Sequence, residues 1–131
     1  MSYDIFLCRF EGGEQRELDF DVVHAIVDPY VTSSAPDRRF LQLAAGTDGG
    51  RADLHLTSAD SIMISHFGGD GIMNVLSELL RGLRAVLLLP GGTVVLNDHA
   101  ELEHLAQKLK SEWSVVVAPT GGEITEAIRA S

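Results

Sequence analysis

The sequence predicts a single α+β domain over residues 1–131, with a mixed, mainly antiparallel sheet covered by three to four helices. Three observations support this fold class. Ten of the 13 glycines form five Gly-Gly doublets that separate segments of strand or helix character, as expected for turns and element ends. The apolar residues switch between the two-residue repeat of strands and the 3.6-residue repeat of helices. Several strand patterns follow one another in the middle of the chain, which favours antiparallel pairing.

The first half of the chain begins with an apolar strand. Residues 2–10 are apolar on both faces, which predicts an interior strand paired on both sides. Residues 19–28 follow helical spacing, with Asp19 as the N-cap and Pro29 after the end. Residues 32–39 are polar and predict a loop, and residues 40–45 predict a short strand. Residues 51–57 alternate apolar and polar side chains, and with residues 61–67 they predict a hairpin.

The second half alternates helices and strands. Residues 70–83 predict the most buried helix, with Asp70 as its N-cap. Residues 85–89 and 93–96 predict either a tight hairpin or a strand with a short returning extension. Asp98 and Glu101 have the spacing of a capping box, heading a third helix that ends near Trp113. Residues 114–118 predict a strand and residues 124–128 a closing helix, an order that allows some parallel pairing.

The composition indicates a protein that folds without disulfides, metal or membrane. A chain of 131 residues that is 45% hydrophobic buries enough apolar surface for one core. Cys8 is the single cysteine, so an internal disulfide is excluded. It lies in an apolar run, where burial leaves a thiol inert. No apolar stretch reaches the roughly 20 residues of a membrane-spanning helix, and the chain opens on a strand pattern instead of a signal peptide. We therefore expect a cytoplasmic location.

The net charge of −9 limits the partners. Nucleic acid is disfavoured, because binding to phosphates requires clustered lysine and arginine. Two interpretations of the acidity stay open. The charge keeps a small protein soluble, or it forms an acidic face that matches a basic protein.

The segment from Phe67 to Gly71 lies between a predicted strand and a predicted helix. Glycine loops at such junctions present backbone N–H groups to phosphates, so Gly68, Gly69 and Gly71, with His66 beside them, are candidate ligand-binding residues. The segment lacks the lysine and hydroxyl of a phosphate-binding loop, and Asp70 would repel an anion. The alternative interpretation is a glycine turn with Asp70 as the helix cap.

The sequence contains no recognisable catalytic or metal-binding pattern, and we expect no cofactor. His99 and His104 are five residues apart, about 140° around a helix, so they do not converge on one metal ion. His55 and His66 would meet across a hairpin only in a suitable register. Ser65 and His66 are adjacent in a strand and are predicted to point to opposite faces.

Two segments resemble known bacterial proteins. The opening MSYDIFLCRF, with IMISHF at residues 62–67 before an apolar helix, is similar to a group of short uncharacterised bacterial proteins. That group has no established active site to transfer. The small size, acidity and α+β pattern are also similar to immunity proteins, which neutralise secreted bacterial toxins.

Three hypotheses on function follow. The first is an acidic, immunity-like binding protein without catalysis that covers a basic protein partner. The second is a small-ligand protein or enzyme with a pocket at the Gly68–Gly71 junction. The third is a self-associating subunit, such as a homodimer. The partner-binding residues expected on outer faces under the first hypothesis are Asp53, His55, Glu101 and Glu103.

Overall fold

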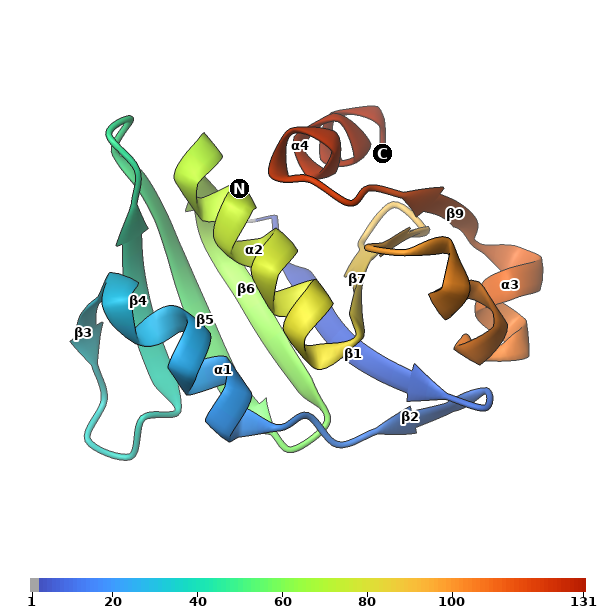
Figure 1. Cartoon of the computed structure of the whole chain (residues 1–131), viewed down its shortest axis with the longest axis horizontal. Helices are drawn as coiled ribbons and strands as arrows, with labels where there is room; N and C mark the ends of the chain where they lie inside the picture. Colours follow the sequence, from blue (N-terminus) through green and yellow to red (C-terminus); the bar gives the residue numbers. More distant parts are fainter. Residues whose placement is uncertain (1–2) are drawn as a thin grey trace.

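The computed structural model describes residues 3–131, which form one α+β domain on a nine-stranded sheet (Figure 1). The strands are β1 (Ile5–Glu11), β2 (Glu14–Arg16), β3 (Val31–Ser34), β4 (Phe40–Ala45), β5 (Gly50–Ser58), β6 (Ser61–Gly68), β7 (Ala85–Leu89), β8 (Thr93–Leu96) and β9 (Ser114–Val117). The α-helices are α1 (Phe20–Val27), α2 (Asp70–Leu83), α3 (Gln107–Glu112) and α4 (Gly121–Ala130). Two 3-10 helices, η1 (Asp28–Tyr30) and η2 (His99–His104), complete the fold. The predicted fold class is confirmed.

The strands lie in the order β3-β4-β5-β6-β1-β7-β8-β9, with β2 as an additional partner of β1. Strand β1 pairs with β6 on one side and β7 on the other, which confirms the interior position predicted for it. The antiparallel pair β5–β6 confirms the predicted hairpin. The pair β7–β8 is also antiparallel, so residues 85–96 adopt the hairpin, the first of the two predicted alternatives. Strands β8 and β9 are parallel, the pairing that the C-terminal order of elements allowed.

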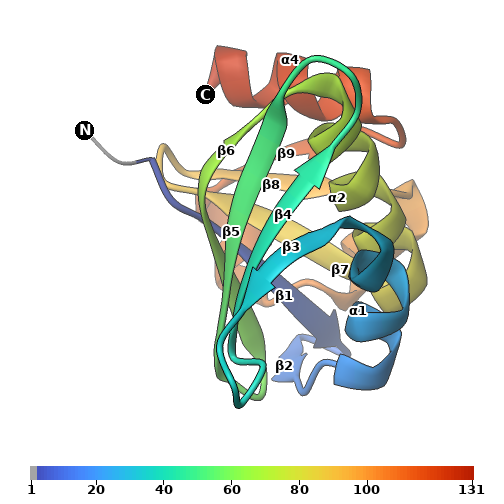
Figure 2. The same cartoon turned by 90° about the vertical axis from the view of Figure 1, so that its left-hand side faces the viewer.

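The main core lies between the sheet and the helices α1, α2 and α4. Helix α2 packs on β4, β5, β6 and β7, between α1 and α4 (Figures 1 and 2). Its Leu79 and Leu80 are fully buried, in agreement with the prediction that this helix is the most buried. Helix α1 has the predicted cap, because the side chain of Asp19 accepts hydrogen bonds from two backbone N–H groups. No helix within residues 3–131 is long and apolar enough to cross a membrane.

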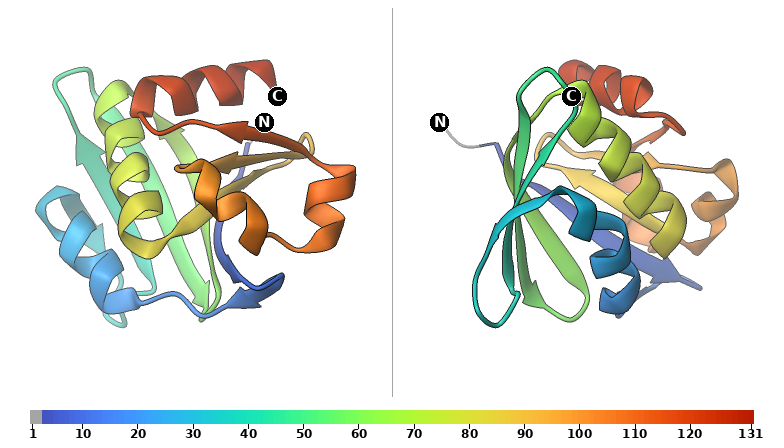
Figure 3. Two further views of the ribbon diagram at one scale, coloured as in Figure 1. Left: turned by 45° about the vertical axis from the view of Figure 1, so that its right-hand side comes forward. Right: turned by 60° about the vertical axis from the view of Figure 1, so that its left-hand side comes forward.

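A smaller apolar cluster lies on the other face of the sheet, over β7, β8 and β9. Here Leu105, which follows η2, and Leu109 of α3 are buried with Val86, Val94 and Leu96. Figure 3 shows η2 and α3, in orange, at this end of the sheet. This end of the sheet is therefore covered on both faces. At the other end α1 and α2 lie on one side of β4, β5 and β6 (Figure 2), and no described helix lies across their opposite face.

Two strands were missed by the sequence patterns. Strand β2 is short and exposed at all of its residues. Strand β3 falls partly in the predicted loop, and it pairs with β4 at the end of the sheet. Its polar residues carry no apolar repeat because this edge strand buries little of its surface.

The predicted third helix is divided into η2 and α3. Asp98 caps the first of these, as predicted, by accepting from the backbone N–H of Ala100. In one continuous helix the carbonyl of His104 would accept from Lys108. Instead that carbonyl accepts from the N–H of Gly13, in the β1–β2 turn, at 3.0 Å. The contact with the distant turn replaces a helical hydrogen bond, and the helix breaks there.

Candidate functional site

A row of four side chains crosses the sheet on the face opposite α1 and α2. His55 of β5 lies directly opposite Phe40 of β4 and Met63 of β6. Met63 in turn lies opposite Phe6 of β1. Directly paired residues of antiparallel strands share a face of the sheet, and the rings of Phe40 and His55 are 4.9 Å apart. We define the open face as the surface formed by Phe6, Phe40, Asp53, His55, Met63 and His66.

The two-residue repeat of β5 places polar residues on the open face. Ala52, Leu54 and Leu56 point into the main core and are almost completely buried. Asp53 and His55 alternate with them, so they point to the other side, where both are half-buried. The structure thus agrees with the orientation predicted for Asp53 and His55. Their contact with a partner stays a prediction.

A β-bulge brings Ser65 and His66 to the same face. The pairing of β6 with β5 shifts next to Ser65, and His66 has a φ of 50°, a region that histidine enters more readily than most residues. His66 Nδ1 lies 2.9 Å from Asp53 Oδ2, and His55 Nε2 lies 3.1 Å from Ser65 Oγ. The prediction that Ser65 and His66 point to opposite faces is therefore wrong, because the bulge interrupts the strand alternation.

These contacts form two separate pairs and no catalytic relay. A serine nucleophile requires a base that a third group orients, and its hydroxyl must reach the substrate. Here Ser65 bonds to His55, whereas Asp53 bonds to His66. Ser65 is also only 4% exposed. This geometry does not provide a nucleophilic site at Ser65.

Cys8 is also poorly suited to catalysis. It is buried in β1, and that burial, together with the charge of Asp60, raises the pKa of its thiol from 9.0 to about 11. The thiol is then protonated at neutral pH and weakly nucleophilic. Among residues 3–131, no three histidine, cysteine, aspartate or glutamate side chains gather in a way that would hold a metal ion.

The junction between β6 and α2 is capped by a residue from another turn. Asp48, between β4 and β5, accepts from the N–H of Asp70 at 2.8 Å and from the N–H of Gly50 at 3.2 Å. The N-cap position is Gly69, with a φ of 94°, and no side chain of α2 caps its own helix. The predicted N-cap role of Asp70 is therefore wrong. The hydrogen bond from Asp70 is the main cause that holds the pKa of Asp48 below its ordinary value of 3.8.

The carboxylate of Asp48 lies where the second hypothesis would place an anionic ligand. A helix N-terminus attracts one negative group through its free N–H groups and its dipole, and Asp48 already supplies that group. Gly71 has a packing role, because a Cβ there would lie 2.6 Å from the backbone of Ala45. A hollow of about 350 Å³ beside the junction is lined by Gly68 and Gly69, but not by His66 or Gly71.

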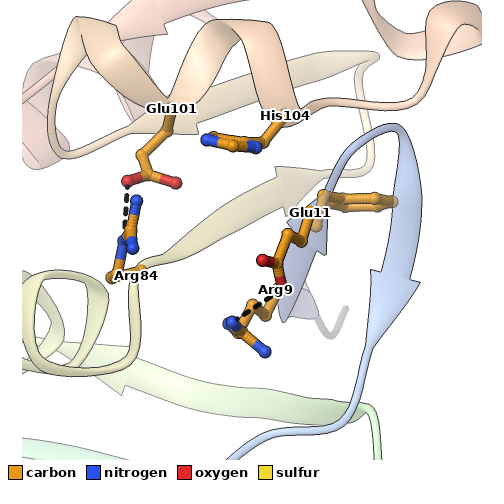
Figure 4. Close-up of a pocket in the computed structure, with 6 residues that line it drawn as sticks. Arg9, Glu11, Arg84, Glu101 and His104 are labelled. Carbon is orange, nitrogen blue, oxygen red and sulfur yellow. Dashed lines mark hydrogen bonds and ion pairs between the residues drawn. The ribbon is translucent and has the colours of Figure 1, made fainter.

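The two glutamates of η2 differ in exposure. The side chain of Glu103 is 79% exposed, as predicted, whereas that of Glu101 is 12% exposed and its Oε1 lies 3.4 Å from Nε of Arg84. The outward orientation predicted for Glu101 is therefore wrong. A 3-10 helix has three residues per turn, so Glu101 and His104 lie on the same side and face Arg84 and β1 (Figure 4).

A charged cluster fills the space between η2 and the strands. The pair of Arg84 and Glu101 lies close to the pair of Arg9 and Glu11, which are 3.1 Å apart, with His104 beside them (Figure 4). The cavity among them measures about 30 Å³, room for roughly one water molecule. The charges of the cluster balance one another, and the Glu101–Arg84 pair joins η2 to the C-cap of α2. The cavity is too small for a substrate.

Comparison with protein-family models, curated proteins and solved structures finds no match to this chain. The function must therefore be inferred from the geometry. Sequence reasoning missed the row from Phe40 to Phe6 and the cap by Asp48. Both depend on strand register, and the only local signal was the alternation of Asp53 and His55 along their strand.

Proposed function

We propose that this protein is a non-catalytic binding protein whose open face covers a basic protein partner. The observation that carries the proposal is the row formed by Phe40, His55, Met63 and Phe6. It lies on a part of the sheet that no described helix covers, and Phe6 is 41% exposed at its end. Exposed apolar side chains that adjoin one another on a folded protein commonly mark an interaction surface.

The side chains of the open face suit a protein interface. Aromatic residues and methionine are enriched where proteins meet, and a sheet holds Phe6, Met63 and Phe40 in fixed positions before binding. Asp53 and His66 form an ion pair at 2.9 Å when the imidazole is protonated, and they add a polar margin to the apolar row. The row supplies buried apolar area, and the polar pair supplies orientation.

The charge of the chain supports a basic partner. A net charge of −9 attracts positively charged proteins over several ångströms and raises their association rate. An immunity-like role, in which an acidic protein covers a basic toxin, is one form of this function. The resemblance to immunity proteins in size, charge and α+β pattern points in the same direction.

Capture from lysate of the native host tests the proposal. Phe6→Ser should abolish capture of a basic protein, because it removes the most exposed ring of the row. The control is Ala25→Ser, since Ala25 is an exposed residue of α1, on the other side of the sheet. For the captured protein, the association rate should fall as salt rises, because screening beyond roughly 8 Å removes the attraction. Equal binding by wild type and Phe6→Ser would contradict the proposal.

A second candidate function rests on the hollow beside Gly68 and Gly69. Its volume of about 350 Å³ falls in the range of small-molecule sites, and Phe67, Asp70 and Arg129 contribute to its lining. The lining carries one charge of each sign, at Asp70 and Arg129, which favours a neutral or zwitterionic ligand. A thermal-shift screen with such compounds tests this function, and Arg129→Ala should change the shift only for ligands that reach the hollow.

A further inference from the structure

The free edge of β9 presents unpaired backbone groups at one end of the sheet. Ser114 donates its N–H to Gly92 at 2.9 Å, and Ala118 donates to Leu96 at 2.7 Å, both toward β8. Successive residues of a strand direct their backbone groups to alternate sides. Val115 and Val117 therefore direct their N–H and C=O groups away from β8. Within residues 3–131 these groups have no hydrogen-bond partner.

The opposite edge of the sheet is protected more fully than β9. Strand β3 is polar, its pairing with β4 is interrupted by a bulge next to Ser33, and Pro29 and Pro36 lie on either side of it. Bulges, prolines and short polar edges discourage the addition of another strand. Strand β9 is also four residues long and is followed by Pro119, but it pairs with β8 in regular register and carries three consecutive valines. Its edge is therefore suited to strand addition.

A groove runs beside this edge, between β9 and α4. It has a volume of about 430 Å³ and is lined by Val116 and Val117 of the strand and by Glu123, Glu126 and Ala127 of the helix. The left panel of Figure 3 shows α4 close to β9 at this end of the molecule. A strand added to β9 would direct alternate side chains toward α4, where it would meet two carboxylates.

The charges of the groove decide between two occupants. A second copy of the chain, paired through β9, would bring two sets of Glu123 and Glu126 together and join two chains that each carry −9. A basic extended segment would instead meet charges of opposite sign. Glu123 has no ion pair among the described residues, and its Oε1 accepts from the Thr120 hydroxyl at 3.0 Å. Glu126 pairs only with the exposed Arg129 at 3.4 Å. Each carboxylate keeps acceptor sites for a lysine or arginine.

We propose that β9 and α4 form a docking site for an extended basic segment of a partner protein, which adds to the sheet as a further strand. Backbone hydrogen bonds to Val115 and Val117 would give affinity, and alternate basic side chains next to Glu123 and Glu126 would give specificity. This site lies apart from the open face, so it goes beyond the proposed function and stands or falls independently of it.

A short blocked peptide of alternating valine and lysine is a suitable probe. The expected result is peptide binding that weakens with salt and slows amide exchange at Val115 and Val117. A peptide with glutamate in place of lysine should bind at least about tenfold more weakly, because its charges repel those of the groove. Phe6→Ser should leave peptide binding unchanged, which separates this site from the open face.

Two variants of the edge sharpen the test. Val117→Pro removes one outward N–H while keeping the bonds to β8, since proline is tolerated at an edge strand. Val117→Pro should lower the affinity for the lysine peptide by about tenfold. Val117→Thr keeps the N–H and should leave the affinity unchanged. Circular dichroism checks that both variants are folded. If Val117→Pro does not fold, Glu123→Gln with Glu126→Gln replaces it and should remove the preference for lysine.

Four results would overturn the proposal. The first is the absence of peptide binding to the folded wild type, and the second is equal binding of the lysine and glutamate peptides. The third is a dimer in sedimentation that Val117→Pro converts to a monomer, because a second copy would then occupy the edge. Protection of Val31–Ser34 amides in place of those of β9 would also contradict it.

Discussion

The row of paired side chains on the outer face of the sheet has two halves, and they meet different surroundings. Beyond Phe6 the row continues through Leu88 of β7, Val94 of β8 and Val115 of β9, each directly opposite the next. In this covered half Val94 is completely buried beneath η2 and α3. In the open half Phe6 is 41% exposed. One continuous row of mainly apolar side chains is therefore buried under η2 and α3 at one end of the sheet and faces solvent at the other.

This difference indicates where the protein's own core ends. The chain covers half of its outer face with η2 and α3 and leaves the other half to solvent. Stability requires only enough buried area for one core, which α1, α2 and α4 already provide on the other face of the sheet. The open half is therefore free to serve binding. The predictions below test that division of roles.

The largest expected effect comes from the covered half. Leu105→Ala removes a side chain that is 1% exposed and should lower the free energy of unfolding by about 2–5 kcal/mol. Phe6→Ala, in the open half, should lower it by only about 1 kcal/mol, because much of the ring is already in water. Urea unfolding of both variants measures the difference. Equal losses would mean that the open half is as important for stability as the covered half.

A smaller effect is expected at the junction that supports the open half. Gly71→Ala places a Cβ 2.6 Å from the backbone of Ala45 and should cost about 1–3 kcal/mol, as in other overpacked sites. Gly68→Ala is the matched control, since nothing lies within 4 Å of the added Cβ, and it should change stability by less than about 1 kcal/mol. Thermal unfolding without ligand is the measurement. Similar losses of stability in the two variants would contradict the packing role of Gly71.

The capping carboxylate of Asp48 gives a pH-dependent effect. Its pKa is lower in the folded state than the ordinary 3.8, so its stabilising effect is present above that value and is lost as the pH falls through the folded pKa. Asp48→Asn should therefore lower the unfolding midpoint at pH 7, and the difference from wild type should shrink below about pH 4.

Asp70→Ala is the control for this prediction. Its side chain makes no cap bond, so the substitution should lower the midpoint less than Asp48→Asn does at pH 7. A larger loss in Asp70→Ala would restore Asp70 as the functional cap of α2. A difference that stayed constant down to acidic pH would show that the charge of Asp48 does not matter.

Much of the fold could be predicted from the sequence, because its core elements have strong apolar repeats. Helix α2 and strands β5 and β6 follow such repeats closely, and the structure confirms them. Strand β3 and the break before α3 could not be predicted in this way. The first is a polar edge strand, and the second results from a hydrogen bond between His104 and the distant Gly13.

The candidate sites were less predictable for a related reason. Strand alternation gave the orientation of Asp53 and His55, but their neighbours depend on register and on the bulge at His66. The side chain that caps α2 belongs to Asp48, which lies 22 residues before Asp70, the donor of the capping hydrogen bond. Local patterns describe what a segment buries, whereas these contacts depend on which segments meet.

The smallest expected effect concerns the contacts that hold η2 over the covered half. Glu101→Gln weakens the ion pair with Arg84 and should cost less than about 1 kcal/mol, because Arg84 is largely exposed and water screens the pair. Glu103→Gln changes the same charge at a side chain that is 79% exposed and should have no measurable effect on stability. A double-mutant cycle with Arg84→Ala isolates the pair, and high salt should reduce its coupling. If the effects of the Glu101 and Arg84 substitutions proved additive, the ion pair would contribute nothing, and η2 would be held by its apolar contacts and by the hydrogen bonds from Gly12 and Gly13 to His104.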